Sequence, residues 1–86
     1  MKSTHTEAYQ RVIAILVSAR RERRLTQAAL AERLGKPQSF VSKFELRERR
    51  LDVTEFFEVC RAIGANPLLV LRQSDLMTDA DVLSTD

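Results

Sequence analysis

The stretch LTQAALAERLGKPQSFVSKFE, residues 25–45, decides the fold of this chain. Thr26 is a favourable N-cap for a helix over residues 27–34, because its hydroxyl accepts a hydrogen bond from a free amide of the first turn. Gly35 is typical of the left-handed residue that follows the end of a helix. A second helix is expected over residues 38–46. The stretch therefore predicts two short helices joined by three or four residues.

Small and apolar residues in this stretch suit a close crossing of the two helices. Ala31 leaves room for the second helix to pass close above the first, and Gly35 permits the sharp turn between them. Val41 fills the angle between the helices, and Phe44 faces the same interior. Two short helices with this spacing are typical of the helix-turn-helix motif, here residues 26–46.

Periodic apolar residues predict a long helix before this motif. They lie three and four positions apart, the repeat that gathers side chains on one face of a helix, at Tyr9, Val12, Ile13, Leu16 and Ala19. A short helix is also predicted later in the chain, because Asn66 is a favourable N-cap and Pro67 fits the first helical position.

Another helix is predicted between these two regions. Asp52 and Glu55 form a capping box, in which each side chain accepts a hydrogen bond from the backbone amide of the other residue, and Gly64 is expected to end the helix. The expected buried stripe of this helix comprises Val53, Phe56, Val59, Cys60 and Ile63. The sequence therefore predicts a compact all-α domain of five helices over residues 1–74, followed by an acidic, flexible tail over residues 75–86.

The composition fits one small helical domain. The chain has 86 residues, of which 44% are hydrophobic and 30% charged, with two Gly and two Pro, so disordered and linker-like classes are excluded. One Cys cannot form an internal disulfide, and one Cys with one His cannot supply a tetrahedral zinc site without additional carboxylate ligands. No apolar run approaches the ~20 residues of a membrane span, so no membrane partner is expected and the cytoplasm is the expected compartment.

Positive and negative charges are separated along the chain. Residues 11–50 contain eleven basic and four acidic residues, a net charge of +7, whereas residues 52–86 contain two basic and seven acidic residues, a net charge of −5. Most of the basic residues are Arg, whose planar guanidinium matches phosphate better than the Lys ammonium does. This asymmetry favours one face that binds a polyanion, with a merely solvated surface as the alternative.

The motif and its flanks resemble the helix-turn-helix domains of phage repressors and Cro proteins, known as the XRE family. The resemblance covers about residues 12–71 and rests on LTQAALAERLG (25–35), QSFVSKFE (38–45), Arg49-Arg50, Ala62-Ile63-Gly64 and Pro67. It implies a lambda-repressor-like fold and a sequence-specific regulator of transcription, most often a repressor, which binds double-stranded DNA with helix 38–46 in the major groove. No Gly-rich phosphate loop, carboxylate cluster or metal-ligand spacing indicates an enzyme, a metal or a cofactor.

The resemblance also implies which residues face the bases. The positions that face base edges in this family are occupied here by Gln38, Ser39, Ser42 and Lys43. Their spacing independently places them in one polar stripe opposite the inward-facing apolar residues of the helix. Gln bonds well to adenine, Lys bonds well to guanine, and Ser tolerates several bases.

Contacts with the DNA backbone are expected from residues around the recognition helix. The resemblance implies that Gln27 contacts a phosphate and also braces this helix. The other expected backbone contacts are Thr26, Lys36, Arg47, Arg49 and Arg50. Arg20 and Glu45 resemble the internal ion pair of the family, which ties the first helix to the end of the third.

Three positions leave alternatives open. Phe40 lies on the exposed side of the recognition helix, where it contacts either a thymine methyl or sugar, or the rim of the neighbouring helix. Arg24 and Arg47 stand where relatives often have Gly. Either these two residues adopt the left-handed conformation that Gly favours, or the preceding helices continue past them.

A domain this small normally needs a two-fold dimer to bind DNA specifically, and the expected homodimer surface is the fifth helix at Leu68, Leu69 and Val70. One alternative function is the antitoxin of a toxin–antitoxin pair, which represses its own gene and binds a protein through the acidic tail. A module that binds only proteins is a further alternative. The polar stripe of the recognition helix argues against it, because protein interfaces favour apolar anchors.

Overall fold

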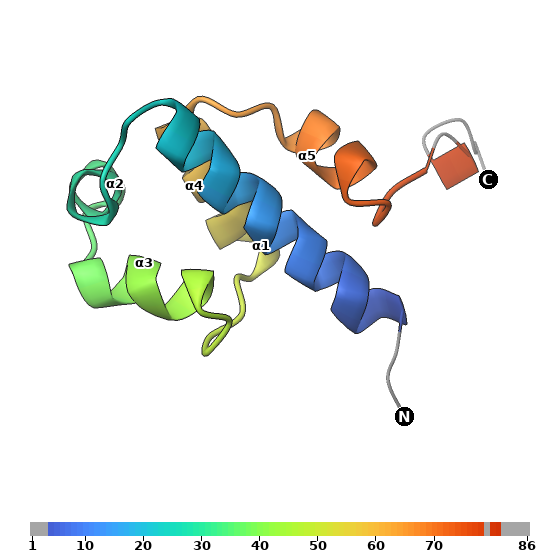
Figure 1. The fold of residues 1–86 in the computed structure, drawn as a ribbon, viewed down its shortest axis with the longest axis horizontal. Helices are drawn as coiled ribbons and strands as arrows, with labels where there is room; N and C mark the ends of the chain where they lie inside the picture. Colours follow the sequence, from blue (N-terminus) through green and yellow to red (C-terminus); the bar gives the residue numbers. More distant parts are fainter. Residues whose placement is uncertain (1–3, 79, 82–86) are drawn as a thin grey trace.

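The computed structural model describes residues 4–78, 80 and 81 (Figure 1). Its helices are α1 (Thr4–Glu22), α2 (Gln27–Leu34), α3 (Gln38–Glu45), α4 (Val53–Ile63) and α5 (Pro67–Gln73). In Figure 1, α1 crosses the molecule diagonally, with α2 and α3 towards one end and α5 along its other side. The described residues contain no strand, so the predicted all-α fold of five helices is confirmed. None of these helices is long and apolar enough to cross a membrane.

The helix ends follow the capping residues that the sequence indicates. The hydroxyl of Thr26 accepts a hydrogen bond from the amide of Ala29 at 3.0 Å, and Gly35 ends α2 in the left-handed conformation, with φ of 67°. The capping box of α4 is complete. The carboxylate of Asp52 accepts from the amide of Glu55 at 2.7 Å, and the carboxylate of Glu55 accepts from the amide of Asp52 at 3.0 Å. Such bonds satisfy amides that have no partner inside the helix.

Two arginines adopt the backbone conformation that Gly favours. Arg24 has φ of 54° and Arg47 has φ of 63°, so the helices before them do not run on. After Arg47 the chain closes in a Schellman-type turn, in which the amide of Glu48 bonds back to the carbonyl of Lys43 at 2.9 Å. This turn ends α3 at Glu45, one residue before the predicted end.

A single core lies between the helices. Its members are fully or almost fully buried and come from every helix and from the α1–α2 turn: Val12, Ile13, Leu16, Leu25, Leu30, Ala31, Val41, Phe44, Val59, Cys60, Ile63 and Val70. Tyr9 closes one edge of this core, and its hydroxyl accepts a hydrogen bond from the amide of Leu51 at 3.1 Å. The predicted inward positions Val41 and Phe44 are both completely buried.

Two residues contradict the expectations from the sequence. Val53 was expected in the buried stripe of α4, but its side chain is 73% exposed because it lies in the first turn, where the stripe extends beyond the core. Val70 was expected at a dimer surface, but it is 3% exposed and belongs to the core. In α5 the residue that faces inward is therefore Val70, whereas Leu68 and Leu69 face outward.

The residues after α5 are hydrogen-bonded to the domain. Ser74 is completely buried, and its carbonyl accepts a hydrogen bond from Nε of Arg11 at 2.7 Å. The amide of Leu76 donates to the hydroxyl of Ser74, and the amide of Met77 donates to the carbonyl of Leu71. Ser74, the last residue of the predicted domain, is thus bonded to α1, and Leu76 and Met77 are bonded to Ser74 and to α5. Residues 79 and 82–86 of the expected flexible tail lie outside the described residues.

Candidate nucleic-acid interface

The helix-turn-helix motif is formed by α2, the turn at residues 35–37, and α3. Ala31 is 3% exposed and Val41 is completely buried, in agreement with the close crossing that the sequence predicts. The amide of Lys36 bonds to the carbonyl of Ala31 at 3.0 Å and closes the turn after Gly35. The turn therefore fixes the direction in which α3 leaves α2.

The outer face of α3 carries the four residues that were expected to face bases. Gln38, Ser39 and Lys43 are exposed and Ser42 is half-buried, opposite the buried apolar residues of the same helix. The hydroxyl of Ser42 donates to the carbonyl of Ser39 at 3.3 Å, within the helix. The two longer side chains, Gln38 and Lys43, are therefore the ones best able to extend away from the domain.

A hydrogen-bond network fixes both ends of α3 to the rest of the domain. Arg20 of α1 and Glu45 at the end of α3 form a bidentate ion pair, with Nε–Oε2 at 2.7 Å and Nη2–Oε1 at 3.0 Å. Nη1 of Arg20 also donates to the carbonyl of Leu25 at 2.8 Å. The side-chain amide nitrogen of Gln27 donates a hydrogen bond to Glu45 at 2.9 Å. The side-chain oxygen of Gln27 accepts one from the side-chain amide of Gln38 at 3.5 Å. The ion pair implied by the resemblance is therefore present, and Gln27 links the start of α2 to both ends of α3.

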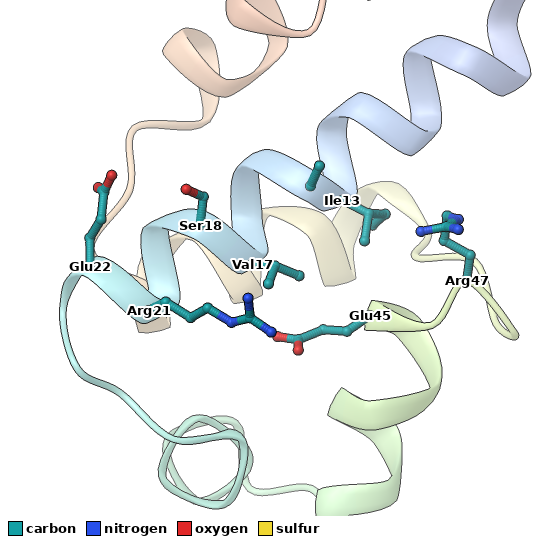
Figure 2. A pocket seen from close by; sticks show the side chains of 8 residues that line it. Ile13, Val17, Ser18, Arg21, Glu22, Glu45 and Arg47 are labelled. Atoms are coloured by element: carbon teal, nitrogen blue, oxygen red, sulfur yellow. The ribbon is translucent and has the colours of Figure 1, made fainter.

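An open hollow of about 610 Å³ lies between α1 and the end of α3. Figure 2 shows the carboxylate of Glu45 on one side of it, with Arg21 of α1 directed towards this carboxylate and Arg47 beyond the end of α3. Ile13 and Val17 supply the apolar wall on the α1 side. The end of α3 therefore lies across this hollow from α1, and the basic residues Arg21 and Arg47 lie at the exposed margin of the hollow.

The basic residues after α3 differ in how they are held. Arg47 is exposed at the left-handed turn. The guanidinium of Arg50 lies 4.7 Å from the ring centroid of Tyr9. Arg49 forms an ion pair with Glu55 at 2.7 Å, and Lys36, at the turn before α3, lies 5.1 Å from the ring of Phe40. Lys36 and Arg49 thus lie beside Phe40 of α3, whereas Arg47 and Arg50 lie beyond the end of α3, near Tyr9 of α1.

Phe40 packs against its own domain. Its ring is half-buried and meets that of Phe44 edge to face, with 5.7 Å between the ring centroids. The guanidinium of Arg49 lies 4.8 Å from the same ring and Lys36 lies 5.1 Å from it, both within the range of a cation–π interaction. Of the two alternatives for Phe40, packing within the domain is the one that the contacts support.

Sequence reasoning missed the second role of Glu55. It identified this residue as the capping partner of Asp52, but the same carboxylate also accepts two hydrogen bonds from Arg49, at 2.8 and 2.7 Å. The bond from Arg49, followed by that from the amide of Asp52, lowers the pKa of Glu55 to about 2. The only signal for this ion pair in the sequence is the opposite charge six positions away, which is too weak to assign a contact across a loop.

Cys60 lies in the core, as predicted, and has no connection with the α3 surface. It is completely buried on α4, and burial raises the pKa of its thiol to about 11. A thiol with such a pKa is neutral at physiological pH and a poor nucleophile.

The motif, the polar outer face of α3 and the basic residues beside it define a helix-turn-helix domain of the DNA-binding type. The helix-turn-helix family profile matches residues 16–70, well over half of the chain, so the protein belongs to the XRE family of helix-turn-helix regulators. The solved structure of an XRE-family like protein from Pseudomonas syringae pv. tomato is similar, with 50% sequence identity and a TM-score of 0.80, over 86% of this chain and 90% of that chain. No curated protein matches the chain.

Proposed function

We propose that the protein is a sequence-specific repressor of transcription that binds double-stranded DNA with α3 in the major groove. The observation that carries this proposal is the outer face of α3, which is polar and exposed while its inner face is fully buried. Membership of the XRE family supports binding to DNA, and a repressor acts by covering its site. Such a protein works in the cytoplasm, where it meets the DNA.

Gln38 and Lys43 are the proposed base-reading residues, with Ser39 and Ser42 between them. The Gln amide presents a donor and an acceptor side by side, which match the N7 and N6 edge of adenine, and the Lys ammonium matches O6 and N7 of guanine. The side-chain amide nitrogen of Gln38 donates a hydrogen bond to the side-chain oxygen of Gln27 at 3.5 Å, so Gln27 orients the base-reading side chain before DNA binds. This support reduces the freedom that is lost on binding.

The phosphate contacts are proposed at the margins of α2 and α3. At the start of α2 the backbone amides of Thr26 and Gln27 have no partner inside the helix, and such amides suit a phosphate oxygen. Positive charge is added at both ends of α3, by Lys36 before the helix and by Arg47 and Arg50 after it. With about three cations per protomer and two protomers on one site, log affinity should fall against log salt with a slope of about −5.

A homodimer through α5 is proposed, with Leu68 and Leu69 as its apolar contact. They are 45% and 51% exposed, so α5 presents apolar surface to a partner. Val70 does not belong to this surface because it is part of the core. Two recognition helices should then meet half-sites centred ~10 base pairs apart, one turn of the duplex.

The test is selection of bound duplexes from a random-sequence pool, followed by titration of variants on the selected site. Gln38→Ala and Lys43→Ala should each weaken binding by ~1–3 kcal/mol and relax the preference at one base pair. Arg61→Ala is the matched control for Lys43→Ala, since it removes one positive charge from an exposed position on α4. Unchanged affinity of the two α3 variants for the selected site would refute the proposed role of α3.

The antitoxin alternative has one observation in its favour. An apolar groove of about 270 Å³ runs between α1, the start of α4 and the residues after α5, and its lining includes Phe57 and Leu76 at 42% and 45% exposure. Exposed apolar surface of this kind is typical of protein-binding sites. Co-purification with the product of a neighbouring gene that encodes a small basic protein would favour this second function.

A further inference from the structure

Arg49 is held by contacts from three parts of the domain. Its Nη1 and Nη2 donate to the two carboxylate oxygens of Glu55, at 2.8 and 2.7 Å. Nη1 also donates to the carbonyl of Arg50 at 3.0 Å. The guanidinium lies 4.8 Å from the ring centroid of Phe40 in α3. One side chain therefore connects the recognition helix, the α3–α4 loop and the first turn of α4.

These contacts use the groups with which Arg would bind a phosphate. A guanidinium grips a phosphate with two parallel N–H donors, and both terminal nitrogens of Arg49 already face the carboxylate of Glu55. The pKa of Arg49 is raised, chiefly by its hydrogen bond with Glu55, and that of Glu55 is lowered to about 2, so both groups are charged at neutral pH. The pair then contributes no net charge towards a polyanion.

Glu55 is itself fixed in place. Its carboxylate accepts the amide of Asp52 at 3.0 Å, and its own amide donates to the carboxylate of Asp52 at 2.7 Å. Arg49 is thus anchored to a capped helix end rather than to a mobile surface group. The loop that it spans carries Arg47 and Arg50, two of the proposed phosphate contacts.

We propose that Arg49 is a positioning residue for DNA binding. Through Glu55 and Phe40 it holds the α3–α4 loop in the conformation that presents Arg47 and Arg50 to the DNA backbone, and it does not itself neutralise a phosphate. This proposal rests on the proposed function and replaces the expectation that Arg49 is a backbone contact. It assigns the charge contribution of the loop to Arg47 and Arg50.

Glu55→Gln separates the two roles because they predict opposite signs. Gln at this position still closes the capping box but removes the ion pair with Arg49. If Arg49 positions the loop, the variant should bind the selected duplex roughly two- to five-fold more weakly, the size expected from loss of an exposed ion pair, with a shallower salt slope. If Arg49 contacts phosphate, loss of the competing negative charge of Glu55 should tighten binding without making the slope shallower.

Two further variants complete the experiment. Arg49→Lys keeps the charge but not the two-pronged geometry, so it should bind as weakly as Arg49→Ala if the residue positions the loop. Glu58→Gln is the matched control, because it removes one negative charge from α4 without touching the Arg49 contacts. All titrations are made at a temperature where circular dichroism shows every variant to be fully folded.

The outcomes are distinct. Weaker binding by Glu55→Gln than by Glu58→Gln, together with failure of Arg49→Lys to restore affinity, would support the positioning role. Tighter binding by Glu55→Gln, restoration by Arg49→Lys, or a lower melting temperature with unchanged affinity would each overturn it. Failure of the unmodified protein to prefer any duplex would instead overturn the proposed function itself.

Discussion

The buried ion pair between Arg20 and Glu45 should dominate the attachment of α3 to α1. Their side chains are 9% and 7% exposed, and the carboxylate accepts two hydrogen bonds from the guanidinium and one from the amide of Gln27. Glu45→Gln preserves the shape of the side chain but removes its charge and turns one of its two acceptor oxygens into an N–H donor group. Arg20 then keeps its bond to the carbonyl of Leu25, but its charge is buried without a counterion.

The expected cost of Glu45→Gln is about 3–5 kcal/mol, the range found when one partner of a buried ion pair is removed. A domain of 86 residues has a total stability of roughly 4–13 kcal/mol, so the variant should lose about a quarter of it or more. The free energy of unfolding is measured by chemical denaturation followed by circular dichroism.

Glu48→Gln is the matched control for this variant, because Glu48 is exposed just beyond the end of α3, and its cost should stay within about 0.5 kcal/mol. If Glu45→Gln costs less than about 1 kcal/mol, the pair behaves as a surface pair and the argument from its burial is wrong.

Four further predictions concern the core, the stability of the fold at acidic pH, the reactivity of the Cys60 thiol and the dimer. Phe44→Ala should cost ~3–5 kcal/mol in denaturation, because Phe44 is completely buried, and a cost below ~1 kcal/mol would place it at the surface. The pKa of Glu55 is lowered to about 2, so its charge stabilises the fold above pH 4.5, and this contribution is lost as pH falls from there through about 2. Over that range the melting temperature should fall more for the unmodified protein than for Glu55→Gln, and parallel curves would contradict the assignment. Cys60, with its pKa raised to about 11, should resist a thiol reagent at pH 8 until the protein is unfolded, and rapid labelling of the native protein would show that it is accessible. Leu69→Glu should leave the circular dichroism spectrum unchanged but reduce the mass in light scattering from that of a dimer to that of a monomer; a dimer that persists would place the interface elsewhere.

The helix ends were predictable because their causes are local. Thr26, Asp52 and Asn66 each cap the helix that follows, and Gly35 and Gly64 each take the left-handed conformation after one. All of these signals lie within a few residues of the backbone groups that they satisfy. The helix-turn-helix motif was predictable for the same reason, since its turn and its small residue at the crossing fall within one short stretch.

The side of a helix that faces the core was less predictable at its ends. Val53 keeps the spacing of the buried stripe, yet it lies in the first turn of α4 at the edge of an open groove and is 73% exposed. On α5 the four consecutive apolar residues Leu68 to Leu71 offer no contrast of polarity, and the positions of α1 and α4 determine that Val70 is the buried one. Which residue of a helix is buried therefore depends on the helices that pack against it, and these are distant in the sequence.

The charged residues of the candidate site were identified as a group but not by role. Arg47, Arg49 and Arg50 look alike in the sequence. The structure distinguishes them, because Arg49 faces Glu55 and Phe40, whereas Arg50 lies over Tyr9. Each of these contacts joins the α3–α4 loop to a helix, so the spacing of charges along the chain does not determine them.

The proposed function requires that α3 reads the sequence of double-stranded DNA. It is tested most directly by titrating the protein, at an ionic strength near 0.15 M, against a duplex selected from the random pool and against the same duplex with its bases shuffled. We expect the protein to bind the selected duplex at least about 10³-fold more tightly than the shuffled one, the lower limit for a specific DNA-binding protein. Equal affinity for the two duplexes would contradict it, because phosphate contacts alone do not distinguish sequences.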